Sequence, residues 1–327
     1  MDQRRRAIPL PTVPYPKHLR GATHANQSRA ATLADSNTAM NTQGTDLATF
    51  SFELFPPKTT EGMDKLKLAV EQLNAVRPRY FSCTYGAGGS TRERTFETVA
   101  WLRQQAIDTA PHLACIGSDK DEVRNIARHY LEQGISRVVA LRGDLPSGMG
   151  RLDSNTFRHA NELVSFLRQE FGDQFHIEVA AYPEIHPQAA SAKIDLVNFK
   201  RKVDAGANAA ITQYFYNADA YFRFVDDCAD AGIDLPIVPG IMPITNYTQL
   251  ARFSDACGAE IPRWIRKRLE GFGEDKDSIR AFGHEVVIAL CQDLLEGGAP
   301  GLHFYTMNQP GPTLRLWEEL ALSHADQ

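Results

Sequence analysis

The sequence has 327 residues, 43% of them hydrophobic, and a formal net charge of −5 at pH 7. This composition suits a globular protein, and its acidic balance gives no electrostatic basis for binding nucleic acid. No apolar run approaches the roughly 18 residues that a membrane-spanning helix needs, so we expect a cytoplasmic protein without membrane or nucleic-acid partners. The five cysteines are an odd number without a CxxC pair, which is typical of buried thiols in a reducing compartment.

Residues 1–47 differ in composition from the rest of the chain. They are rich in Arg, Pro, Ser, Thr, Asn and Ala and show no sustained hydrophobic period, which predicts a disordered extension. The run Arg4-Arg5-Arg6 could open a transit peptide or a twin-arginine signal, but no apolar stretch follows it, so we do not favour targeting. Residues 48–327 are then expected to form one catalytic domain.

From Thr49 onward, an apolar strand-like run, a loop and an amphipathic helix recur roughly every 25 to 35 residues, the spacing of βα units. The predicted strands are residues 49–55, 79–85, 111–116, 136–142, 175–181, 209–214, 236–241 and 301–305. Two additional helices are predicted before the last strand, near 262–270 and 277–296. The pattern predicts an α/β fold, a (β/α)8 TIM barrel. An open doubly wound sheet would show the same alternation, although no strand is followed by GxGxxG or GxxxxGK[ST].

The stretch FSFELFPPK, residues 50–58, places the ionisable residue Glu53 inside a β-prone run that two prolines end. Because side chains alternate along a strand, Glu53 lies on the opposite face from Phe52 and Leu54. If that apolar face meets the helices, Glu53 points into the barrel near the C-terminal end of the strand, where barrel enzymes keep their chemistry. A carboxylate satisfied by backbone donors or by Arg142 would give the same pattern.

Nearly every predicted strand carries polar residues at one of its ends or just after it. They include the glycine-rich turn from Thr84 to Arg92, then His112, Arg142, Asp144, Tyr182, His186, Thr212, Gln213 and the segment 303–308. Their concentration at one rim predicts a ligand site there. No HxH, HExxH or GxSxG motif is present, so we expect neither a metal site nor a nucleophilic serine.

One face of the predicted helix 191–205 carries Asp195, Asn198 and Lys202, with Arg201 beside them. Such a face could reach a diphosphate and a ribose. A solvated face of salt bridges would look the same, so both interpretations stay open.

Eight segments taken together resemble a known family. They are FSFELFPPK, CTYGAGGSTRERT, APHLACIG, VVALRGDLP, AAYPEIHP, FKRKVDAGANAAITQYFYN, IVPGIMPITNY and LHFYTMNQ, between residues 50 and 309. In order and spacing they resemble the methylenetetrahydrofolate reductases of the bacterial single-domain type. The resemblance implies a (β/α)8 barrel that binds FAD non-covalently. It also implies ping-pong reduction of 5,10-methylenetetrahydrofolate to 5-methyltetrahydrofolate by NADH or NADPH, which feeds methionine synthesis.

The resemblance assigns two carboxylates to catalysis. Glu53 matches the general acid that protonates N10 of the folate, and its apolar neighbours lead us to expect a pKa raised by desolvation. Asp144 matches the carboxylate near the flavin pyrimidine and the folate pterin, where its charge would disfavour an anionic reduced flavin.

The resemblance also assigns binding residues. The matches to FAD contacts are Thr84, Tyr85, Ala87, His112, Arg142, Gly143, Asp144, Tyr182, His186, Asp195, Asn198, Arg201 and Lys202. The matches to substrate positions are Gln213, Gln249, Phe253, Met307 and Gln309. Gln309 is neutral where many relatives carry arginine, which leaves the binding of the folate tail open.

Further expectations concern assembly and regulation. We expect a homo-oligomer with small-molecule substrates and no inhibition through an S-adenosylmethionine-responsive domain. Two rival interpretations remain at this point. One is another flavin barrel, such as a proline dehydrogenase-like enzyme. The other is a flavin-free barrel, either a folate-binding methyltransferase or a lyase that uses Lys58 or Lys202 as an amine nucleophile.

Overall fold

A computed structural model of the chain describes residues 48–85, 89–143 and 156–322, so the predicted disordered extension 1–47 lies outside the described residues. The strands of the described part are β1 Thr49–Leu54, β2 Phe81–Cys83, β3 Thr109–Ala114, β4 Arg137–Leu141, β5 His176–Ala181, β6 Ala209–Thr212, β7 Ile237–Val238, β8 Gly240–Ile241 and β9 Gly301–Tyr305. Its helices are α2 Thr60–Asn74, α3 Gly89–Gln104, α4 Lys120–Glu132, α5 Ala160–Phe171, α6 Ala192–Asp204, α7 Ala218–Asp230, α8 Tyr247–Cys257, α9 Arg263–Phe272, α10 Lys276–Glu296 and α11 Pro310–Glu319. None of these helices has the length and apolar character needed to cross a membrane.

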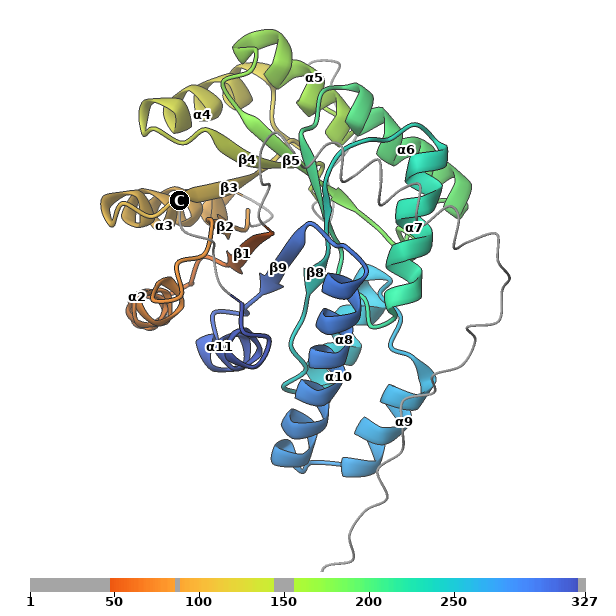
Figure 1. Ribbon diagram of the computed structural model, residues 1–327. Coiled ribbons are helices and arrows are strands. Elements are labelled where there is room, and N and C mark those ends of the chain that lie inside the picture. Colours follow the sequence, from red (N-terminus) through yellow and green to blue (C-terminus); the bar gives the residue numbers. More distant parts are fainter. Residues whose placement is uncertain (1–47, 86–88, 144–155, 323–327) are drawn as a thin grey trace, which may run out of the picture. The chain divides into compact units, whose positions relative to one another are not determined.

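The strands form a parallel sheet that closes on itself, with the helices around it (Figure 1). The strand order is β7-β6-β5-β4-β3-β2-β1-β9-β8, and the two strands at its ends are consecutive in the chain. β7 pairs with β6 and β8 pairs with β9, so the segment 237–241 closes the barrel. The predicted (β/α)8 barrel is therefore confirmed, including the two additional helices α9 and α10 before the last strand.

Several strand boundaries differ from the prediction. The predicted strand 236–241 is interrupted at Pro239, which has no N–H to donate and whose carbonyl accepts the His303 N–H at 3.0 Å. The predicted strand 79–85 shortens to residues 81–83, and the predicted strand 111–116 begins two residues earlier, at Thr109. Pro111 therefore lies within β3, opposite Cys83 in the ladder, rather than at the start of the strand.

The alternation along β1 separates the helix-facing side of the strand from the barrel interior. Phe52 packs edge-on against Phe81, Phe304 and the α11 residue Trp317, with ring centroids 5.6 to 5.8 Å apart. On the opposite face, Ser51 is fully buried inside the barrel. Because Glu53 shares the face of Ser51, it also points inward.

A polar network occupies the barrel interior near the N-terminal ends of the strands. The Tyr80 hydroxyl donates to Glu178 Oε2 at 2.8 Å, and Arg137 donates to Glu178 Oε1 at 2.5 Å. The Arg137 guanidinium also lies over the Tyr80 ring, 4.7 Å from its centroid. These paired groups fill this end of the barrel, while the cavity described next lies toward the C-terminal ends.

Candidate active site

A cavity of about 510 Å³ lies at the C-terminal mouth of the barrel. Eight residues that the sequence singled out line it: Glu53, Thr84, His112, Arg142, Tyr182, His186, Gln213 and Phe253. Other lining residues include Gln188, Tyr214, Met242 and Tyr305. The cavity has the size and the mixed polar and apolar walls of a site for a large organic ligand.

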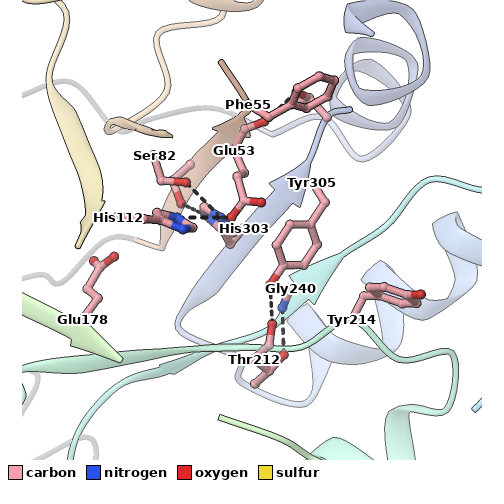
Figure 2. Close-up of polar contacts among 12 residues, drawn as sticks. Glu53, Phe55, Ser82, His112, Glu178, Thr212, Tyr214, Gly240, His303 and Tyr305 are labelled. Atoms are coloured by element: carbon pink, nitrogen blue, oxygen red, sulfur yellow. Dashed lines mark hydrogen bonds and ion pairs between the residues drawn. The ribbon is translucent and has the colours of Figure 1, made fainter. Parts of the chain in front are cut away.

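The Glu53 carboxylate lies between two imidazoles (Figure 2). Its Oε2 is 3.4 Å from His112 Nε2 and 3.5 Å from His303 Nε2. His112 Nε2 is enclosed and has no hydrogen-bond partner among the described residues, so the carboxylate is the polar group that faces it. His303 is fixed from its other nitrogen, because the Ser51 hydroxyl lies 2.7 Å from Nδ1. The three side chains form a compact titratable cluster.

The electrostatics of this cluster contradict the expected rise of the Glu53 pKa. Burial does oppose ionisation, but the neighbouring His112 and His303 outweigh it and lower the pKa from 4.5 to about 2. The expectation took the sequence neighbours Phe52 and Leu54 as the surroundings of the carboxylate, although both point to the opposite face of β1. The protein thus favours the ionised form of Glu53.

This lowered pKa predicts a pH dependence of stability. The ionised Glu53 stabilises the folded state above the ordinary pKa of 4.5, and that contribution is lost as pH falls toward the folded-state pKa of about 2. We expect Glu53→Gln to remove roughly 2 kcal/mol of this pH-dependent stability over that window. Urea unfolding from pH 6 to pH 2.5 checks it, with Glu71→Gln, an exposed carboxylate on α2, as control. If the free energy of unfolding changed with pH in the same way in Glu53→Gln and in the wild type, the lowered pKa would be contradicted.

The loop after β9 holds the C-terminal end of β1 in place. Thr306 Oγ1 donates to the Glu53 carbonyl at 2.6 Å. The Asn308 side chain both donates to the Phe55 carbonyl at 2.8 Å and accepts the Phe55 N–H at 3.1 Å. Met307 and Asn308 adopt left-handed backbone angles, with φ of 52° and 55°, which turn the chain sharply here. Met307 and Gln309 belong to this rim loop and do not line the cavity.

Tyr305 forms a wall of the cavity at the point where the barrel closes. Its hydroxyl donates to the Thr212 carbonyl at 2.7 Å, and the Gly240 N–H donates to Thr212 Oγ1 at 2.9 Å (Figure 2). Burial, and then the charge of Glu53, raise the pKa of the Tyr305 phenol well above its ordinary value. Tyr305 therefore remains a neutral donor that ties β9 to β6.

Several predicted cofactor residues lie near the cavity without lining it. Tyr85 accepts a hydrogen bond from Arg92 at 2.6 Å. Gly143 has a φ of +83°, and a Cβ at that position would come within 3.0 Å of Ile116 and Ala114, so glycine is required for this turn. Ala87 and Asp144 lie outside the described residues.

The predicted polar face of α6 points toward the loop that follows β5. Asp195 Oδ2 accepts the His186 N–H at 2.7 Å, and Arg201 donates to Asn198 at 3.0 Å. Lys202 Nζ donates to the Ala180 carbonyl, and burial lowers the Lys202 pKa to about 8 despite the nearby Asp195. On this face, Asp195 and Lys202 are thus hydrogen-bonded to β5 and the loop after it, whereas Asn198 and Arg201 are exposed. Gln249 lies in the first turn of α8, one turn before Phe253, and does not line the cavity.

Sequence reasoning missed His303 as a partner of Glu53. The two residues are 250 positions apart, and their contact depends on the pairing of β1 with β9, which aligns Ser51 with His303 and Glu53 with Tyr305. The alternation within β9 was a usable signal, because His303 and Tyr305 share the barrel-facing side of that strand.

A parallel barrel with a part-buried carboxylate and polar groups gathered at its C-terminal mouth defines the class of (β/α)8 barrel enzymes. A family model described as methylenetetrahydrofolate reductase matches residues 39–321. The chain is 42% identical to 5,10-methylenetetrahydrofolate reductase of Salmonella typhimurium, over 88% of this chain and 93% of the relative. It is 43% identical to the Escherichia coli enzyme of that name, over 79% of this chain and 86% of the relative. The protein therefore belongs to the methylenetetrahydrofolate reductase family and is an oxidoreductase.

A solved structure adds support for the fold. It is titled as an uncharacterized protein from Clostridium thermocellum that binds two copies of 5-methyl-5,6,7,8-tetrahydrofolic acid. Its TM-score is 0.62 at 16% identity, over 86% of this chain and 97% of that chain. At this identity the similarity supports the barrel architecture alone.

Proposed function

We propose that the protein binds FAD at the mouth of the barrel and reduces 5,10-methylenetetrahydrofolate to 5-methyltetrahydrofolate with a reduced nicotinamide, in a ping-pong sequence. The product would serve methionine synthesis. The observation that carries this proposal beyond family membership is the cluster of Glu53, His112 and His303 beside the cavity. In this proposal, the cluster supplies the proton that a weakly basic folate nitrogen needs.

The described residues fit a flavin dinucleotide. The cavity walls combine apolar side chains, such as Leu141 and Ile211, with polar groups from several strand ends, which suits a flat ring system with polar edges. The exposed Asn198 and Arg201 on α6 offer a donor and a cation for a ribose and a diphosphate. Lys202 holds a further ammonium group beside the end of β5. No other cofactor is needed to account for these groups.

FAD, when bound, would supply hydride transfer from the nicotinamide to the folate. Glu53 supplies the proton, which must reach N10 for the five-membered ring of the methylene folate to open to a reducible iminium. The proton leaves Glu53 Oε2 and remains on N10 of the product, so each turnover leaves Glu53 as a carboxylate. The two imidazoles 3.4 and 3.5 Å away are placed to return a proton to it.

The low pKa of Glu53 does not prevent this role, because ligand binding changes the surroundings of the carboxylate. Aromatic ligands that displace water from the cavity would increase the desolvation that already opposes the carboxylate form. Ligand binding therefore raises the pKa of Glu53 and favours the protonated acid that the reaction uses.

An anaerobic visible spectrum tests the whole proposal. The purified protein should be yellow or become so with FAD, bleach on addition of NADH or NADPH, and recover its colour with 5,10-methylenetetrahydrofolate. Bleaching without recovery would indicate a flavin barrel that acts on another substrate. A protein that takes up no FAD would refute the proposal.

A further inference from the structure

A second cavity, of about 140 Å³, lies at the N-terminal ends of β2, β3 and β4. It shares no lining residue with the active-site cavity, and the proposed reaction makes no use of it. Three arginines line it: Arg79 just before β2, Arg103 in the last turn of α3 and Arg137 at the start of β4. We propose that this cavity binds a tetrahedral oxyanion of the phosphate class, either free phosphate or the phosphate group of an ester.

Arg79 supplies a positive charge that no bonded partner neutralises. Its side chain is exposed and forms no ion pair or hydrogen bond within the part of the chain that the structure describes. Its backbone N–H donates to the Phe50 carbonyl at 2.8 Å, which fixes the chain next to the cavity. The guanidinium can therefore bind an anion without giving up an existing bond.

Arg103 is only partly satisfied by its own neighbours. Its Nη1 donates to the Ile107 carbonyl and to Asp108 Oδ1, each at 3.3 Å. The Asp108 side chain is 77% exposed, so water competes for this ion pair and the pair is weak. Nε has no hydrogen-bond partner among the described residues, and Nη2 faces Gly134, where an added Cβ would lie 3.4 Å away. Arg103 thus keeps donor capacity for a ligand.

Arg137 is the most firmly held of the three arginines. Its Nη1 donates to Glu178 Oε1 at 2.5 Å, and its guanidinium lies over the Tyr80 ring, 4.7 Å from the centroid. A guanidinium has five N–H donors in a fixed fork, and the bond to Glu178 uses one of them. Arg137 is therefore a preorganised donor at the inner wall of the cavity.

The balance of charge around the cavity favours an anion. Asp108 lines the cavity and Glu178 lies behind Arg137, so two carboxylates face three guanidinium groups. Arg168 adds a further cation near His176 and donates to the neutral carbonyls of neighbouring loops. The His176 imidazole senses this excess, because burial and then the charge of Arg137 lower its pKa although Glu178 opposes the shift.

The arrangement and the size of the cavity fit a phosphate group better than a carboxylate. The three arginines come from three different elements, and a planar carboxylate has only two oxygens to offer them. A tetrahedral phosphate offers more oxygens and a second charge. The volume is well below the roughly 300 to 1,000 Å³ of a site for a larger organic ligand. Because Gly134 and Ser136 are exposed at the border of the cavity, the rest of an ester could remain in solvent.

The test is calorimetric titration and thermal unfolding of the full chain with inorganic phosphate, at an ionic strength held constant with sodium chloride. For the wild type, we expect saturable binding and a melting temperature that rises with phosphate concentration. Arg79→Gln and Arg103→Gln should each raise the Kd about ten-fold, because a hydrogen bond to a charged group contributes on the order of that factor. Acetate, which is planar and carries one charge, should bind about ten-fold more weakly than phosphate.

Arg223→Gln, which removes an exposed arginine from α7, is the matched control and should bind phosphate as the wild type does. Glycerol 3-phosphate distinguishes the two sources: affinity equal to that of phosphate indicates the group of an ester, and binding about ten-fold weaker indicates the free ion. A wild type without saturable phosphate binding would overturn the proposal. An affinity unchanged in both arginine variants would overturn it too, because the ion would then bind elsewhere, and so would acetate binding as tight as that of phosphate.

Discussion

Replacing Glu53 by glutamine is expected to slow folate reduction by a factor on the order of 10² to 10⁴, the usual contribution of a positioned general acid. Oxidation of the nicotinamide, which needs no proton from Glu53, should continue at close to the wild-type rate. The amide keeps the shape of the carboxyl group but cannot pass a proton to N10. Anaerobic stopped-flow measurement of the two half-reactions, each followed by flavin absorbance, separates these effects.

Glu178→Gln is the matched control for general damage to the barrel interior. Glu178 is a buried carboxylate that also faces the interior, nearer the N-terminal ends of the strands, where it binds Tyr80 and Arg137. Its replacement should lower the free energy of unfolding, because Arg137 loses its partner, while both half-reactions persist in the folded protein. If a folded, FAD-loaded Glu53→Gln protein lost both half-reactions, the assignment of Glu53 as the acid would be wrong.

The orientation of Glu53 could be predicted from nine residues of sequence. Alternation along a strand is a local property, and the contrast between the Phe52 face and the Ser51 face determines which side meets the helices. The eight βα repeats were predictable for a similar reason, since each repeat carries its own hydrophobic period. The fold and the location of the site follow from such local patterns.

The electrostatic environment of Glu53 could not be obtained in this way. It depends on His112 and His303, which reach the carboxylate from other strands only once the barrel has formed. A residue that is adjacent in sequence to a strand residue points to the other face, so the apolar neighbours of Glu53 indicated a pKa shift of the wrong sign. Long-range strand register, which no short window contains, decided the outcome.

The hydrogen bonds that α6 makes near the end of β5 could not be predicted from the sequence pattern either. The sequence predicted the face of α6 that carries Asp195 and Lys202. It did not predict that Asp195 binds the His186 N–H or that Lys202 turns toward the end of β5. Asp195 thereby holds the loop after β5, and Lys202 binds the strand itself at Ala180. The part of this face that stays exposed is the part that can meet a ligand.

The second large effect is expected at the closure of the barrel, where Gly240→Ala should lower the free energy of unfolding by about 3 kcal/mol. A Cβ at this position would lie against the Thr212 carbonyl oxygen and 2.5 Å from the Tyr305 ring. The backbone oxygen cannot rotate away as a flexible side chain could, so β8 or β6 must shift. Urea unfolding, followed by tryptophan fluorescence, measures the change.

Gly271→Ala provides a control of opposite sign. Gly271 lies within α9 and has open space around it, so alanine should stabilise the protein by roughly 0.5 to 1 kcal/mol through helix propensity. If the free energy of unfolding of Gly240→Ala instead lay within 1 kcal/mol of the wild-type value, the tight packing of Gly240, Thr212 and Tyr305 would be refuted.

Because Tyr305 also lines the active-site cavity, the same substitution should raise the KM for folate in the protein that remains folded. Closure of the barrel and the shape of the active site thus both depend on glycine at position 240.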